Sequence, residues 1–131
     1  MTRKIILDCD PGHDDAVALL LAMGNPNIDL LGITTVGGNQ TLDKVSHNAR
    51  VVKEIAGHPE IPVYAGCDRP LVRPVEVAEA IHGSTGMDVE GVKLPQPSTA
   101  LADAHAIDFI IDTIMSLSLI HISEPTRQAE I

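Results

Sequence analysis

Residues 4–16 read KIILDCDPGHDDA and join a short apolar run to four aspartates. The apolar run at residues 4–7 is typical of a strand that is buried on both faces of a parallel sheet. The Pro-Gly pair at residues 11–12 is a turn signal, and residues 13–23 then follow a helical spacing. The last eight residues of this predicted helix are apolar on every side, so we expect it to be buried. The stretch therefore predicts a strand–turn–helix unit that carries carboxylates at its turn.

The rest of the chain repeats the alternation of strand and helix. Further strands are predicted at 28–36 and 61–64, further helices at 42–56 and 100–115, and a long functional loop at 66–98. Two helical stripes are apolar, namely Val45, Ala49, Val52 and Ile55 in the second helix, and Ala104, Ile107, Ile111 and Ile114 in the third. This order predicts an α/β protein with a mostly parallel, Rossmann-like open sheet and flanking helices.

Composition excludes several classes of function. The chain of 131 residues carries 9 Lys and Arg against 18 Asp and Glu, which gives a net charge of −9 and makes binding to nucleic acid improbable. Aromatic residues are only 2% of the chain, which argues against a base-stacking surface. We expect neither a leader nor a membrane span, because no positively charged start is followed by an apolar region and no apolar run is long enough. Cys9 and Cys67 are predicted to be reduced core residues, so the cytoplasm is the expected compartment.

The last fifteen residues, LSLIHISEPTRQAEI at 117–131, break the pattern. A fourth apolar strand is due after the third helix, and none follows. One back-translation of these residues resembles the transposase-end adapter used in sequencing libraries. We therefore expect residues 1–116 to be the N-terminal part of one domain, and residues 117–131 to be a translated adapter tail without function.

The four aspartates can be explained by a structural role or by a chemical one. Asp14 and Asp15 alone would be explained as first-turn residues that face the positive end of a helix dipole. Asp8 and Asp10, however, lie at the carboxyl end of a strand, where open α/β sheets bind ligands. A tight turn would bring Asp10 back toward Asp14 and Asp15, and such a set of oxygen ligands suits calcium or magnesium. The residues alone thus predict metal-assisted hydrolysis, with one carboxylate as general base.

Two other functions are compatible with these residues. A haloacid-dehalogenase-like phosphohydrolase would use Asp8 as nucleophile and Asp10 as acid and base, with magnesium, although the acidic pair after the turn fits that chemistry badly. A calcium-binding fragment without catalysis is the second alternative. On the residues alone, Asn39 reads as a turn residue and His82 as an ordinary loop histidine.

Four motifs occur in order along the chain: DCDPGHDDA (8–16), GITTVGGNQTLDK (32–44), PVYAG (62–66) and IHGSTGMD (81–88). Together they resemble the inosine-uridine-preferring nucleoside hydrolases, most of all the bacterial pyrimidine-preferring ribonucleoside hydrolase branch. The resemblance spans residues 4–115. It implies that the full-length protein hydrolyses the N-glycosidic bond of pyrimidine nucleosides, inosine or both to ribose and free base, by way of a calcium-activated water.

The resemblance also implies roles for the acidic residues. Asp10 would bind the calcium and act as general base, and Asp15 would be a second calcium ligand. Asp8 would help to hold Asp10 and Asp15 in place and would not contact the substrate.

The substrate contacts that the resemblance implies come from three further residues. Asp14 and Asn39 would bind ribose hydroxyls, and His82 would line the nucleobase side and assist the leaving base. Family members are about twice as long as this chain or longer and form dimers or tetramers, so we expect a truncated nucleoside hydrolase fold that is inactive by itself.

Overall fold

The computed structural model describes residues 2–78, 80 and 83–117. Residues 118–131 of the predicted tail and the candidate His82 lie outside the described residues. Strands and helices alternate along the chain in the order β1 (Arg3–Cys9), α1 (His13–Gly24), β2 (Ile28–Thr35), α2 (Leu42–Ile55), β3 (Val63–Ala65) and α4 (Ala106–Ser116). The predicted α/β alternation is confirmed, and residues 66–98 contain no strand and no full helix among those described.

The strands form one parallel sheet in the order β1-β2-β3. Their register places Cys9 opposite Thr35, and Thr35 opposite Ala65, so all three strands end at the same level. A register shift between Ile5 and Ile6 interrupts the ladder near the start of β1. Because the strands end together, the segments that follow them start side by side at one edge of the sheet.

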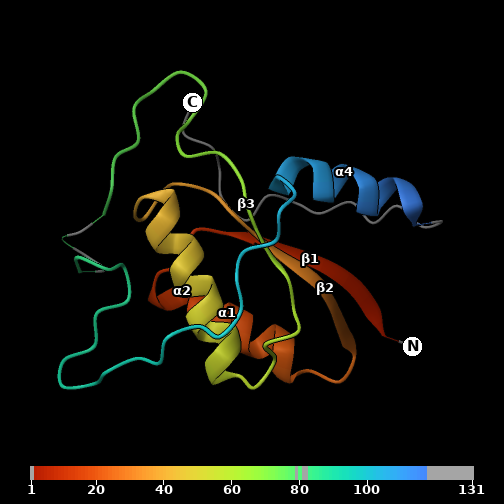
Figure 1. The fold of residues 1–131 in the computed structure, drawn as a ribbon, viewed down its shortest axis with the longest axis horizontal. Helices are drawn as coiled ribbons and strands as arrows, with labels where there is room; N and C mark the ends of the chain where they lie inside the picture. The colour runs from red at the N-terminus through yellow and green to blue at the C-terminus, as the bar shows by residue number, and fades with distance from the viewer. Residues whose placement is uncertain (1, 79, 81–82, 118–131) are drawn as a thin grey trace.

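Helices cover both faces of the sheet (Figure 1). Ile33 of β2 is fully buried in the core that the sheet forms with α1 and α2, together with Leu19, Ala49 and Val63. The preceding residue, Gly32, faces the opposite side, where it lies against the ring of Phe109 in α4. Successive strand residues point to opposite faces, so α1 and α2 cover one face and α4 covers the other.

The first strand–helix unit is less buried than predicted. In α1 only Leu19 and Ala22 are buried, whereas Leu21 is 69% exposed. The expectation of burial on every side is wrong, because the described chain packs against one face of this helix only. Residues 5–7 of β1 are half-buried rather than buried on both faces, since this strand has a neighbour on one side only within the described sheet.

Helix α4 begins at Ala106 and not at the predicted Ala100. The preceding segment is held in another conformation, because the backbone N–H of Ala102 donates to the carbonyl of Val63 at 2.9 Å. The side chain of His105 then caps the helix by accepting the backbone N–H of Ile107 at 3.2 Å. Ala104 is therefore outside the helix.

The apolar stripes behave differently in the two later helices. In α2 the stripe is buried as predicted, except for its last member, Ile55, which is exposed at the helix end. In α4 the stripe of Ile107, Ile111 and Ile114 is exposed, at 49%, 52% and 40%. The sheet is instead covered by the other side of this helix, where Phe109 stacks on Tyr64 with ring centroids 3.9 Å apart.

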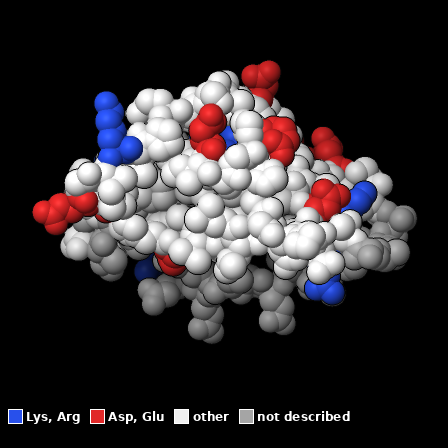
Figure 2. All heavy atoms as spheres, turned by 90° about the horizontal axis from the view of Figure 1, so that it is seen from below, with Lys and Arg blue, Asp and Glu red and all other residues white. Residues whose placement is uncertain are grey.

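Charged side chains are dispersed on the face shown in Figure 2. Several Asp and Glu residues lie among uncharged atoms, and the Lys and Arg residues lie apart from one another, so the described residues form no continuous basic surface there. No helix in the described parts of the chain is long and apolar enough to cross a membrane.

Candidate active site

The loops that follow β1, β2 and β3 are bonded to one another beyond the ends of the strands. The backbone N–H of Val36 donates to the carbonyl of Cys9 at 3.3 Å, and that of Gly37 donates to the carbonyl of Cys67 at 2.9 Å. This brings the acidic loop after β1 next to the glycine loop at 37–39. The carboxyl edge of the sheet is where open α/β proteins bind ligands.

Asp10 and Asn39 are joined at this edge by two hydrogen bonds. The backbone N–H of Asn39 donates to Oδ2 of Asp10 at 2.7 Å, and Nδ2 of Asn39 donates to the carbonyl of Asp10 at 2.9 Å. Both residues are nearly buried, with exposed fractions of 9% and 6%. A Cβ atom at Gly38 would lie 2.2 Å from Oδ2 of Asp10, so only glycine allows the loop this close to the carboxylate.

Asp15 reaches back to Asp10 from the first turn of α1. Its Oδ2 accepts the backbone N–H of Asp10 at 3.1 Å. Burial raises the pKa of the Asp15 carboxyl above its ordinary value, and the charges of Asp10 and Asp14 raise it further, while the hydrogen bond from Asp10 opposes the shift. Asp14 is exposed in the same turn. The structure thus brings Asp10, Asp15 and Asn39 together.

Asp8 is directed to a different partner. Its Oδ1 accepts the hydroxyl of Thr34 at 2.6 Å, across from it on β2. Its charge, with those of Asp15 and Asp10, adds to burial in raising the pKa of the Cys9 thiol, so this buried cysteine stays protonated. Cys9 is a free core cysteine as predicted, whereas the free Cys67 is exposed and the prediction of a core position is wrong for it.

The donor atoms of Asp10 and Asp15 are of the type that a hard cation prefers, but they are too few to hold one. Asp10 and Asp15 offer carboxylate oxygens, the ligands that calcium and magnesium prefer, and calcium takes about six to eight of them. No group of three or more His, Cys, Asp or Glu side chains within the described residues could hold a metal ion. Any cation bound by Asp10 and Asp15 would therefore need further ligands from outside this group.

Three polar residues that sequence reasoning did not single out lie beside the glycine loop. Gln40 just before α2, and Lys44 and Asn48 within it, follow a four-residue spacing, and their side chains donate to the carbonyls of the segment at 83–85. The spacing was a visible signal for one helical face. The carbonyls that these side chains bind lie about forty residues away in the sequence, and no sequence pattern indicates them.

The segment at 83–88, which we name the GSTGMD turn, is folded around one carboxylate. Asp88 accepts the backbone N–H of Ser84 at 2.7 Å and the hydroxyl of Thr85. The hydroxyl of Thr85 lowers the pKa of Asp88 most, and the bonds from Ser84 lower it further. The candidate His82 directly precedes this turn in sequence and lies outside the described residues.

The fold and the acidic edge place the chain among open-sheet α/β proteins with a ligand site at the carboxyl ends of the strands. A sequence model of the family described as "Inosine-uridine preferring nucleoside hydrolase" matches residues 5–127. The chain belongs to this family.

Similar proteins support the assignment. The chain is 59% identical over 116 residues to the inosine-uridine preferring nucleoside hydrolase of Leishmania major, covering 88% of this chain and 37% of that protein. It is 51% identical to the pyrimidine-specific ribonucleoside hydrolase RihB of Escherichia coli, covering 87% of this chain and 36% of that protein. The chain thus spans little more than a third of the length of these relatives.

A solved structure agrees with the sequence relatives. The purine-preferring ribonucleoside hydrolase from Gardnerella vaginalis superposes with a TM-score of 0.79 at 36% identity, covering 87% of this chain and 37% of that one. The predicted fold, the N-terminal part of a nucleoside hydrolase, is confirmed. These comparisons give no support to the two alternatives, the dehalogenase-like phosphohydrolase and the non-catalytic calcium-binding fragment.

Proposed function

We propose that the complete protein hydrolyses the N-glycosidic bond of ribonucleosides, with pyrimidine nucleosides and inosine as substrates, to ribose and free base. The observation that carries the proposal is the buried pair of Asp10 and Asn39 next to Asp15, in a chain of the nucleoside hydrolase family. Cleavage of such a bond passes through an oxocarbenium-like state, which nearby carboxylates stabilise.

Asp10 is the general base in this proposal. Its Oδ2 accepts the N–H of Asn39, which fixes the direction of the carboxylate that takes a proton from water. Asp10 and Asp15 would hold a calcium ion together with ligands outside the described residues. When bound, the ion lowers the pKa of a ligated water and orients substrate hydroxyls.

Asp14 and Asn39 bind the ribose in this proposal. The bond from Nδ2 of Asn39 to Asp10 uses one amide hydrogen, so the other hydrogen and Oδ1 can meet a ribose hydroxyl. Asp14, exposed in the first turn of α1, presents its carboxylate beside Asp15. His82, on the nucleobase side, assists departure of the base. Asp8 keeps β1 and β2 in register through Thr34.

Several finer properties belong to the same proposal. The protein acts in the cytoplasm on small nucleosides, forms a dimer or tetramer, and uses neither nucleic acid nor membrane as a partner. We further propose that residues 117–131 are adapter-derived and take no part in the activity.

Release of reducing sugar tests the proposed function. The protein expressed from its complete gene is incubated with uridine, cytidine and inosine, before and after removal of calcium with a chelator, and with p-nitrophenyl phosphate as the substrate of the dehalogenase alternative. We expect free ribose from at least one nucleoside, loss of activity on chelation, and recovery with calcium. Phosphate release without ribose release would refute the proposal.

A further inference from the structure

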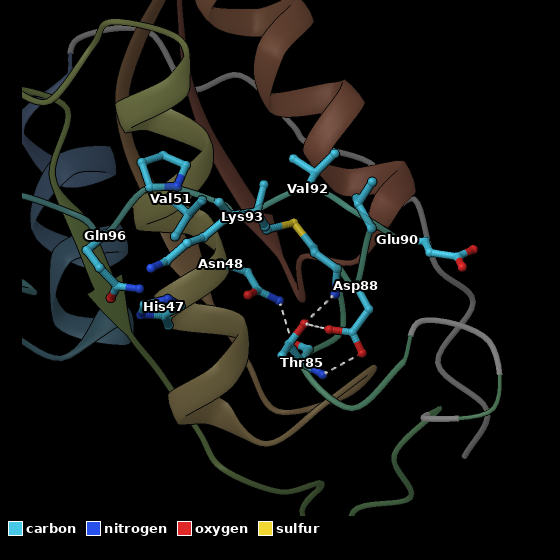
Figure 3. Close-up of a pocket in the computed structure, with 13 residues that line it drawn as sticks. His47, Asn48, Val51, Thr85, Asp88, Glu90, Val92, Lys93 and Gln96 are labelled. Atoms are coloured by element: carbon cyan, nitrogen blue, oxygen red, sulfur yellow. Dashed lines mark hydrogen bonds between the residues drawn. The ribbon is translucent and has the colours of Figure 1, made fainter.

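Asn48 joins two segments that are far apart in sequence. Its side chain is 3% exposed in α2, and Nδ2 donates to the carbonyl of Pro11 at 3.1 Å and to the carbonyl of Thr85 at 2.9 Å. Figure 3 shows the amide of Asn48 directed at Thr85. The two amide hydrogens are thereby shared between the acidic loop after β1 and the GSTGMD turn.

The contact with Pro11 lies in the middle of the acidic loop. Pro11 follows Asp10 directly, and the carbonyl of the next residue, Gly12, accepts the N–H of Ala16 in the first turn of α1. A shift of the Pro11 peptide would therefore change the position of Asp10 relative to α1, which carries Asp14 and Asp15.

The GSTGMD turn depends on polar contacts to stay on α2. Gln40 and Lys44 donate to the carbonyls of Gly83 and Ser84, and Asn48 donates to the next carbonyl along. Met87 adds one buried apolar side chain. After the GSTGMD turn, a pocket of about 650 Å³ lies between the chain and α2 (Figure 3), lined by His47, Asn48, Val51 and residues 85, 87–90 and 92–96.

The turn also lies close against the amide itself. Gly86 has a positive φ of 87°, and a Cβ atom there would lie 3.0 Å from Nδ2 of Asn48. Any side chain at this position would strain the backbone and press on the amide. The close approach of the GSTGMD turn to Asn48 therefore depends on glycine at position 86.

We propose that Asn48 is a positioning residue, which holds the acidic loop and the GSTGMD turn in one arrangement so that Asp10 and the segment following His82 face the same substrate. This inference rests on the proposed function, because it assigns Asn48 a part in the nucleoside reaction. Asn48 itself acts through the two carbonyls that it binds and does not touch the reacting atoms.

The test compares Asn48→Asp with Arg50→Met in the protein expressed from its complete gene. Aspartate keeps the size of the side chain but replaces the donor with a carboxylate that repels both carbonyls. Arg50 is a matched control, because it lies on the same helix and donates to a different loop carbonyl, that of Thr99, at 2.8 Å. Amide hydrogen exchange and steady-state kinetics with a nucleoside are measured for both variants.

We expect Asn48→Asp to speed amide exchange at least tenfold in residues 10–15 and 83–88 together, with exchange in β2 unchanged. We also expect kcat to fall about 10- to 100-fold while KM changes less than threefold, because misplaced catalytic groups slow the chemical step. Arg50→Met should produce neither effect. Faster exchange throughout the chain, in one segment only, or in neither segment would overturn the proposal, and so would an unchanged kcat.

Gly86→Ala disturbs the same contact through the GSTGMD turn, and it is the replacement variant if Asn48→Asp fails to fold. It should give the same paired loss of protection, and protection retained in residues 10–15 would count against the coupling. If the wild-type protein releases no ribose, the proposed function fails, and the exchange data alone decide whether Asn48 couples the two segments.

Discussion

Asp10 is held by contacts that reach it from two directions. Asn39 binds both its carboxylate and its carbonyl, and Asp15 accepts its backbone N–H. Gly38 lets the backbone come within van der Waals range of the carboxylate. A carboxylate fixed in this way needs little reorganisation when it takes a proton, which is the property that a general base requires.

Asp10→Asn tests the role of this residue in the protein expressed from its complete gene. The amide keeps the size of the side chain, and its oxygen can still accept the N–H of Asn39, but it cannot take a proton. We expect turnover of the best nucleoside substrate to fall by at least about 100-fold. Asp29→Asn is the control, because Asp29 is exposed near the opposite end of β2. Near-normal turnover in Asp10→Asn would assign the base to another residue.

The approach of Asp15 to Asp10 could be predicted from local rules, whereas the place of Asn39 beside them followed only from the family resemblance, because on the residues alone Asn39 reads as a turn residue. Parallel strands end at a common edge, and a tight turn returns the chain toward the strand that it leaves. The role of Asn48 could not be predicted in this way. Its partners are backbone carbonyls, which every residue possesses, so no sequence pattern marks them out.

At the scale of whole elements, the predicted helix starts are close to the observed ones where local sequence signals set them. They are wrong where a contact with a distant residue sets them. Helices α1 and α2 begin at His13 and Leu42, where the sequence predicts them. Helix α4 begins six residues late, because Ala102 pairs with the carbonyl of Val63 and His105 caps the next turn. Periodicity alone contains no information about that pairing.

The docking of α4 on the sheet depends on the absence of a side chain at Gly32. A Cβ atom there would lie 2.7 Å from Cζ of Phe109, whose ring stacks on Tyr64. We expect Gly32→Ala to destabilise the fold by about 1–3 kcal/mol through overpacking. Tyr64 is the only tyrosine and the chain has no tryptophan, so intrinsic fluorescence should report the displaced ring directly.

Gly24→Ala is the control for this substitution. A Cβ atom at Gly24 meets nothing within 4 Å, and the residue ends α1. Its effect on the denaturation midpoint should be neutral or slightly stabilising, with unchanged tyrosine emission. Equal effects of the two substitutions would show that α4 does not pack on Gly32 in solution.

The GSTGMD turn should respond to pH through Asp88. Its pKa lies below the ordinary value in the folded state, mainly because of the Thr85 hydroxyl. The ionised carboxylate therefore stabilises the turn at pH values above the ordinary aspartate pKa, and this contribution is lost as the pH falls through the lowered pKa. We expect Asp88→Asn to loosen the turn at neutral pH and to match the wild type at acid pH.

Nuclear magnetic resonance of the Ser84 and Thr85 amides follows this change, since both amides donate to Asp88. Their shifts in the wild type should titrate together at acid pH, and the same amides in Asp88→Asn should not titrate. Glu54→Gln is a useful control, because Glu54 accepts from Ser98 on a separate part of the loop. A wild-type turn that does not respond to acid would contradict the prediction.

At the scale of the whole molecule, the described chain has a covered core and two uncovered apolar surfaces. One is the outer side of α1, with Val17, Leu20 and Leu21, and the other is the isoleucine stripe of α4. Exposed apolar areas of this kind mark surfaces that become buried in an interface or cause aggregation. The sequence predicted the isoleucine stripe, but the choice of which face of α4 meets the sheet depends on Phe109 and Gly32.

The 131-residue chain expressed alone should therefore self-associate and bind the hydrophobic dye ANS. The double substitution Ile107→Lys and Ile111→Lys should reduce both effects clearly, because it places two charges on the stripe of α4. Leu71→Lys and Val72→Lys add the same charge at exposed positions in the long loop and should change little. Size-exclusion chromatography with light scattering measures the association. An equal response to both pairs would mean that net charge, and not the stripe, controls it.

The two cysteines differ in exposure, so a label can be attached to the chain at one known position. Cys9 is buried with a thiol that burial keeps protonated, so an alkylating reagent at neutral pH should modify Cys67 alone. Cys67 accepts the N–H of Gly37 through its carbonyl, directly beside the loop that holds Asp10 and Asn39. A fluorophore attached there would sense movement of the glycine loop when a nucleoside arrives, without any engineered residue. Binding could then be followed optically in real time.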